Sequence, residues 1–61
     1  MIIEVGKRYV RRDGNTSGYI VPTTSRAYPW WDPLYGECYV ENGRWVSDEI
    51  EDHADLVAVA E

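Results

Sequence analysis

Four aromatic residues cluster in the middle of the chain, and they are the first candidates for a binding surface. Tyr28, Trp30, Trp31 and Tyr35 lie within eight residues that also contain two prolines. Rigid aromatic side chains with a polar edge are typical of protein-binding hot spots, and they also stack on nucleic-acid bases. Neighbours in an extended segment point opposite ways, so one indole can be exposed while the other is buried. The alternative is that these aromatics only close over a thin core.

A second candidate is a basic segment near the start of the chain, where four of the six basic residues lie between positions 7 and 12. On a strand, alternate residues share a face, which separates Arg8 and Arg12 from Lys7 and Arg11. Guanidinium groups beside an aromatic ring suit phosphate, so Arg8, Arg11 and Arg12 are candidate ligands for a nucleotide. The alternatives are a solvated edge strand and pairing with carboxylates elsewhere in the chain.

A run of acidic residues near the end of the chain is a third candidate surface. Its members are Asp48, Glu49, Glu51 and Asp52. Such a run could meet a basic partner or mimic nucleic-acid phosphates, and the default alternative is a solvated acidic loop. The Asp-x-Asp-x-Asp-Gly spacing of a calcium loop is missing, so the sequence predicts no metal site.

The sequence offers little for catalysis. Its single histidine, His53, and its single cysteine, Cys38, lie in different predicted elements, and no spacing gives either one an orienting partner. A Cys–His pair brought together by the fold is the alternative, but Cys38 also suits a small core position. We therefore expect a protein that is not an enzyme and holds no cofactor.

Length and composition limit the class of protein further. The 61 residues suffice for one small domain, residues 1–61, and the aromatics are all Tyr or Trp, so each brings a polar group that needs a partner. One cysteine cannot form an internal disulfide, and the sequence shows neither a signal-peptide pattern nor an apolar run of membrane-spanning length. A formal net charge of −5 disfavours double-stranded nucleic acid as a partner. These features predict a cytoplasmic protein, for which a homodimer remains an option.

The strongest structural signal is Asn42-Gly43, which lies between two runs typical of strands. A two-residue type I′ turn needs positive φ at both positions, and Asn and Gly adopt it at least cost. Val40 would then face Trp45 across a hairpin. The faces follow from this register: the core side is expected to carry Cys38, Val40 and Trp45, and the outer side Tyr39, Glu41, Arg44 and Val46.

The remaining segments favour further strands. β-branched and aromatic residues predict a strand over 7–12 and its return strand over 19–21, with a turn from Asp13-Gly14 between them and Pro22 ending the second. We expect an ordered aromatic loop without regular structure over 23–35, one helical turn or an acidic loop over 48–55, and a last strand over 56–60. Together these elements predict an all-β protein, a small SH3-like five-stranded antiparallel barrel with one long aromatic loop.

Several short motifs follow one another along nearly the whole chain: Gly6/Tyr9, Arg12-Asp13-Gly14, Tyr28-Pro29-Trp30, Gly43/Trp45 and Asp55-Leu56-Val57. Their order resembles that in a group of small proteins encoded by tailed phages and prophages, mostly of unknown function. The resemblance implies a phage origin and a small β-barrel, and it carries no active site. Small phage proteins often act on host machinery or host defence, so by analogy we expect this chain in the cytoplasm of a bacterial host.

These observations lead to one expected function and two alternatives. The first is a non-enzymatic, phage-type binding module that inhibits or sequesters a host factor by protein–protein contact. The second is a sponge for a linear or cyclic nucleotide signal, with an indole stacked on the base and arginines on the phosphate. The third is a structural component of the phage particle.

Overall fold

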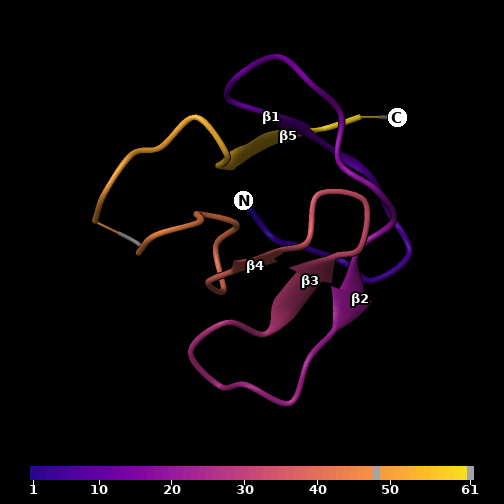
Figure 1. Ribbon diagram of the computed structural model, residues 1–61, viewed down its shortest axis with the longest axis vertical. Coiled ribbons are helices and arrows are strands. Elements are labelled where there is room, and N and C mark those ends of the chain that lie inside the picture. The colour runs from indigo at the N-terminus through magenta and orange to yellow at the C-terminus, as the bar shows by residue number, and fades with distance from the viewer. Residues whose placement is uncertain (48, 61) are drawn as a thin grey trace.

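The computed structural model describes residues 1–47 and 49–60, and its five strands form two antiparallel sheets (Figure 1). The strands are β1 (Tyr9–Arg11), β2 (Val21–Pro22), β3 (Trp30–Asp32), β4 (Glu37–Tyr39) and β5 (Leu56–Val59). One sheet pairs β1 with β5, and the other has the order β2-β3-β4. The predicted all-β class is confirmed, and the described residues contain no helix. The prediction of a closed barrel is wrong, because no ladder joins the two sheets within this part of the chain.

The first sheet brings the two ends of the chain together. β1 pairs with β5 through Tyr9 opposite Val59 and Val10 opposite Ala58, and a bulge then places Arg11 opposite Leu56. The prediction that the strand over 7–12 pairs with 19–21 holds only at Lys7, whose carbonyl accepts from the Ile20 amide at 3.0 Å, whereas β1 itself pairs with β5. Residues 12–18 instead turn back on β1 itself, through a single bridge between Val10 and Thr16.

The second sheet contains a strand where a loop was predicted. Residues 23–35 were expected to lack regular structure, yet Trp30, Trp31 and Asp32 form the central strand β3. Trp31 lies opposite Cys38 on one side and Val21 on the other. Pro22 was expected to end its strand, but it is part of β2, at the edge of the sheet, where the missing N–H removes least from the ladder.

The turn at Asn42-Gly43 exists, but its loop has three residues. The Gly43 amide donates to the Val40 carbonyl at 2.9 Å, and the Val40 amide donates to the Arg44 carbonyl at 2.8 Å. Gly43 has φ +93°, while Asn42 has a negative φ, so the turn is not type I′. This is the pattern of a type I turn followed by a left-handed glycine.

The longer loop shifts the predicted pairing by one residue. Val40 lies opposite Arg44, which places Tyr39 on the same face as Trp45. Tyr39 is fully buried, whereas Val40 and Cys38 are half-buried and Val46 is exposed. The prediction that Tyr39 lies on the outer face is therefore wrong, because one added loop residue exchanges the two faces of a strand.

The core lies between the two sheets and takes side chains from both. Ile3, Tyr9, Ile20, Tyr39 and Leu56 form it, and Trp30 and Trp45 pack against it. The buried tyrosines satisfy their hydroxyls as expected from a chain without Phe. The Tyr9 hydroxyl accepts from the Glu4 amide at 2.7 Å, and the Tyr39 hydroxyl donates to Glu37 at 3.1 Å.

Gly43 is the point where the N-terminal segment, the 41–43 turn and β5 meet. Its carbonyl accepts from the Leu56 amide at 2.9 Å, and a Cβ at this position would lie 2.9 Å from Cδ1 of Ile3. We expect Gly43→Ala to lower the free energy of unfolding by about 2 kcal/mol, from backbone strain and from displacement of Ile3. Gly14→Ala is the control, because Gly14 has a similar φ of +91° but open space around it. Urea denaturation should give a loss of about 1 kcal/mol for the control, and equal losses would contradict the packing role of Gly43.

Candidate functional site

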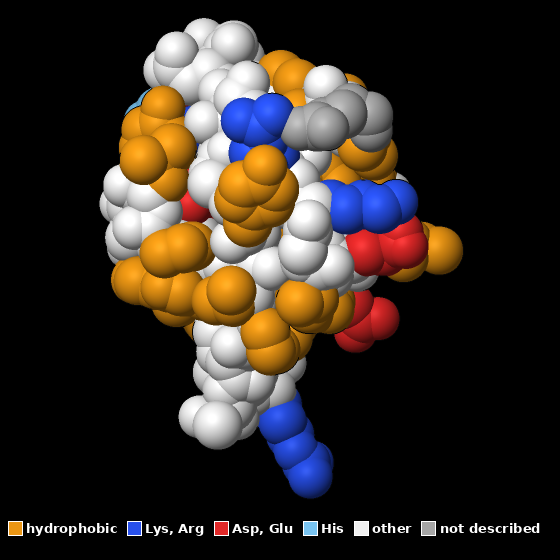
Figure 2. Space-filling view, turned by 90° about the vertical axis from the view of Figure 1, so that its right-hand side faces the viewer, with side chains coloured by type: hydrophobic (Ala, Val, Ile, Leu, Met, Phe, Trp, Pro, Cys, Tyr) orange, Lys and Arg blue, Asp and Glu red, His pale blue; other side chains and the backbone are white. Residues whose placement is uncertain are grey.

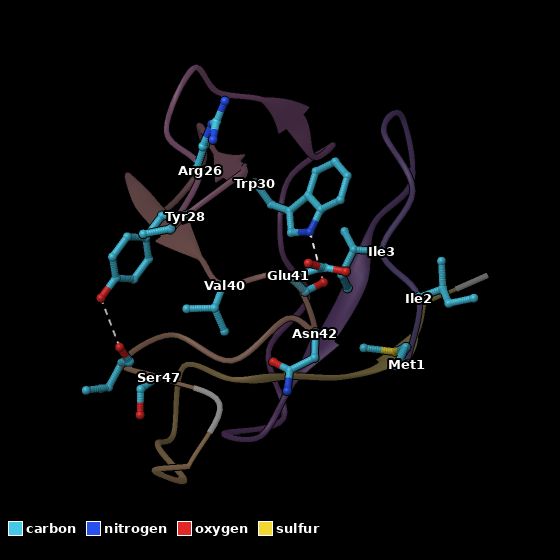
Figure 3. A pocket seen from close by; sticks show the side chains of 12 residues that line it. Met1, Ile2, Ile3, Arg26, Tyr28, Trp30, Val40, Glu41, Asn42 and Ser47 are labelled. Carbon is cyan, nitrogen blue, oxygen red and sulfur yellow. Dashed lines mark hydrogen bonds between the residues drawn. The ribbon is translucent and has the colours of Figure 1, made fainter.

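A groove of about 620 Å³ lies between the N-terminal segment and the 40–47 turn, and it is the candidate binding site. Figure 3 shows Trp30 in its middle, Ile2 and Met1 on one side and Tyr28 on the other. The residues that line it are Met1, Ile2, Ile3, Arg26, Ala27, Tyr28, Trp30, Val40, Glu41, Asn42, Val46 and Ser47. The groove therefore contains two of the four predicted aromatic residues.

Hydrogen bonds fix both of these aromatic side chains. The Tyr28 hydroxyl donates to the Val46 carbonyl at 3.0 Å, and Trp30 Nε1 donates to the Glu41 carbonyl at 3.1 Å. Tyr28 is also held by its own loop, because its carbonyl accepts from the Thr23 hydroxyl at 2.6 Å. A rigid aromatic surface loses little conformational entropy on binding, which suits a recognition site.

The other two predicted aromatics lie outside the groove. Trp31 follows Trp30 on an extended strand and so points to the opposite face, near Gly36. Tyr35 lies in the β3–β4 turn, and the Arg11 guanidinium sits over its ring, 3.9 Å from the centroid. The aromatic cluster expected from the sequence is thus divided between two faces of the molecule.

The three arginines proposed as phosphate ligands all interact within the protein. Arg11 is buried and pairs with Asp13 at 3.1 Å and with Glu37 at 3.0 Å. Arg12 pairs with buried Asp55 at 3.1 Å. Arg8 lies over the Tyr19 ring, 5.3 Å from the centroid. None of the three lines the groove.

The ion pair of Arg11 belongs to a buried polar group beside the core. Glu37 accepts from the Tyr39 hydroxyl as well as facing Arg11. Burial raises the pKa of Tyr39, and the nearby Glu37 carboxylate raises it further, so the phenol stays protonated and acts as a donor. This arrangement assigns a structural role to Arg11.

The predicted acidic surface is described except for Asp48, which lies outside the described residues. Glu49 and Glu51 are exposed and Asp52 is half-buried. The Asp52 carboxylate interacts with neighbours in its own segment. Its Oδ1 accepts from the Ala54 amide at 3.1 Å and lies 2.9 Å from Nδ1 of His53. The exposed carboxylates are therefore those of Glu49 and Glu51.

Asp55, which closes this acidic segment, is fully buried. Its Oδ1 accepts from the Trp45 amide at 2.9 Å, and its Oδ2 accepts from the Asp52 amide at 2.9 Å and from Arg12 at 3.1 Å. Burial raises the pKa of this carboxyl, but the three hydrogen bonds and the Arg12 charge outweigh it, so the net pKa lies below its ordinary value. Asp55 thereby ties the 44–55 segment to the end of β1.

His53 and Cys38 do not form a site together. His53 is exposed and meets Trp45 edge-to-face, with the ring centroids 6.2 Å apart. Cys38 is half-buried and lines a second hollow of about 500 Å³, which is also lined by Trp45 and shares Tyr28 and Val46 with the groove. Within residues 1–47 and 49–60, no three side chains of metal-binding type come together as a metal site would require.

Exposed aliphatic residues around the groove were missed by the sequence analysis. Ile2 is 85% exposed, and Met1 and Val46 are also exposed. Exposed hydrophobic side chains also lie among charged ones on the face of the molecule that Figure 2 shows. The apolar run at positions 1–3 was the available signal, but only the fold shows that Ile3 enters the core while Ile2 stays outside.

Comparisons with protein-family models, with curated proteins and with solved structures gave no significant match. In the part of the chain that the structure describes, no helix has the length and apolar character needed to cross a membrane. The class is therefore defined by the fold alone, as a small all-β domain of two sheets with an aromatic groove.

Proposed function

We propose that this protein is a non-enzymatic binding module whose groove holds a segment of a partner protein. The single observation that carries the proposal is the exposed apolar rim of Met1, Ile2, Tyr28 and Val46 around a partly buried Trp30. Large aliphatic and aromatic side chains that lie together at a groove gain free energy when a partner covers them. The consequence for the partner would be inhibition or sequestration.

The positions of the arginines support a protein partner over a nucleotide. A phosphate at Arg11 or Arg12 would have to displace Asp13, Glu37 or Asp55 from a short ion pair. Loss of the Arg12 pair would leave Asp55 buried without a counter-charge, which costs several kcal/mol, and loss of the Arg11 pairs would do the same to the half-buried Glu37 at a smaller cost. A host protein of a bacterial cell is the partner we propose, in keeping with the phage-like order of motifs in the sequence.

The variant Ile2→Glu should weaken partner binding strongly without affecting the fold. Ile2 is 85% exposed, so the substitution leaves the core intact, but a bound partner would bury the new carboxylate against apolar surface. We expect the affinity for the partner to fall about tenfold or more. The partner would be captured from bacterial lysate, identified by mass spectrometry, purified, and titrated calorimetrically against each variant.

Leu34→Glu is the matched control, because Leu34 is also an exposed aliphatic residue, at 66%, and does not line the groove. It should bind the purified partner as wild type does. Equal affinities for wild type and Ile2→Glu, or equal losses in both variants, would remove the groove from the mechanism. Thermal stabilisation by a linear or cyclic nucleotide would instead support the sponge alternative.

A further inference from the structure

The groove has opposite charge at its two ends. Arg26, on the loop between β2 and β3, is exposed at one end, and Ser47 lies at the other (Figure 3). From Ser47 the chain leads to the exposed carboxylates of Glu49 and Glu51. A ligand that fills the groove therefore meets a cation at one end, the exposed Glu41 within the lining, and two anions on the segment beyond the other end.

Local contacts hold Glu49 and Ile50 beside Ser47, at the end of the groove. The Glu49 amide donates to the Ser47 hydroxyl at 3.3 Å, and Ser47 forms an antiparallel bridge with Ile50. Ile50 lies between the two glutamates and is 51% exposed. The segment thus offers an apolar side chain flanked by carboxylates, and it follows Val46 at the rim of the groove.

We infer that the partner segment recognised by this protein is apolar with lysine or arginine at one end, an inference that rests on the proposed function. The apolar side chains would cover Ile2, Tyr28 and Trp30, and the basic side chains would lie over Glu49 and Glu51. Arg26 repels a second cation, so the basic end of the segment lies at the Ser47 end of the groove. The net charge of −5 favours the same class of partner through long-range attraction.

Three synthetic peptides of equal length test the inference by fluorescence anisotropy at low salt. The first has an apolar centre and a lysine pair at one end, the second has glutamates in place of the lysines, and the third keeps the lysines without the apolar centre. We expect the first to bind at least about tenfold more tightly than the others. Added salt should remove most of the difference between the first two, because exposed charges are screened.

Two variants with the same net charge locate the effect. Glu49→Gln/Glu51→Gln and the control Asn15→Lys/Thr16→Lys both change the net charge from −5 to −3, but only the first pair lies on the segment that follows Ser47 at the end of the groove. We expect the first variant to weaken binding of the apolar-lysine peptide about fivefold at low salt, and the control less than twofold. Arg26→Glu should strengthen binding of the same peptide.

Equal binding of the lysine and glutamate peptides would overturn the inference. Equal effects of Glu49→Gln/Glu51→Gln and Asn15→Lys/Thr16→Lys on binding would also overturn it. If both apolar peptides bind equally and Ile2→Glu abolishes both, the groove remains a protein-binding site and only the charge preference is wrong. Absence of binding by every peptide also overturns the inference, and the proposed function is then decided separately by the purified partner and the Ile2 and Leu34 variants.

Discussion

Asp55→Asn is expected to lower the free energy of unfolding by about 3 kcal/mol at neutral pH. The asparagine oxygen can face either the Trp45 amide or the Asp52 amide together with Arg12. In either orientation the new NH₂ group opposes a donor in a fully buried position. A domain of 61 residues has a total free energy of unfolding of about 3–9 kcal/mol. Urea denaturation should therefore show that Asp55→Asn has lost a large part of its stability.

The Asp55 contribution should also depend on pH. Its folded-state pKa lies below the ordinary value of 3.8, so its stabilisation is complete above that value and is lost as the pH falls through the folded pKa. The difference between wild type and Asp55→Asn should therefore shrink on acidification from neutral pH. Glu51→Gln removes the same charge from an exposed position in the same segment, and it should change stability by less than about 0.5 kcal/mol. A difference between wild type and Asp55→Asn that does not change with pH would contradict the role of the charge.

Elements with strong local preference were predictable from the sequence. Tyr9 and Val10 marked β1, and the run over 56–60 marked β5, because β-branched and aromatic residues favour extended backbone. Their pairing was not predictable, since it joins opposite ends of the chain and no turn signal reports a long-range contact. β3 was not predicted, because the prolines around its two tryptophans disfavour a strand locally. The strand forms because it pairs with β2 on one side and β4 on the other.

The hairpin shows how a correct turn can give a wrong face. Asn42-Gly43 does make the turn, yet one additional loop residue exchanged the sides of Tyr39 and Val40. Both the two-residue and the three-residue loop place a glycine at a positive φ, so Gly43 alone could not distinguish them.

The candidate site was predictable only in part, because exposure is decided by tertiary structure. Tyr28 and Trp30 both line the groove, whereas Trp31 and Tyr35 lie outside it. Nothing in the basic segment distinguishes Arg11 from its neighbours. Only the fold brings Glu37 and Asp13 to its guanidinium, which buries a charge that sequence patterns assign to the surface.

The largest effect of a single substitution is expected for Arg11→Met, at about 3–5 kcal/mol, which would leave the domain mostly unfolded. Arg11 is 4% exposed, and its guanidinium forms ion pairs with Asp13 and Glu37 and lies over the face of Tyr35. Methionine fills much of the space but leaves the half-buried Glu37 carboxylate without its counter-charge, and it also removes the ion pair of the more exposed Asp13. Circular dichroism in urea, with an osmolyte added to restore a folded baseline, measures the loss.

Two further variants separate the ion pair from other causes. Lys7→Met removes the cation of an ion pair with Glu4 in which both side chains are about half exposed, so it should cost less than about 1 kcal/mol. Arg11→Met/Glu37→Gln removes both charges while an amide oxygen still accepts from Tyr39, and it should be more stable than the sum of the single effects predicts. Additive losses would show that the Arg11–Glu37 pair contributes nothing of its own, and Arg11 would then act through Asp13 or through packing on Tyr35. If the double variant is more stable than additivity predicts, the Arg11–Glu37 ion pair stabilises the fold, although the sequence pattern predicted Arg11 as a ligand-binding residue.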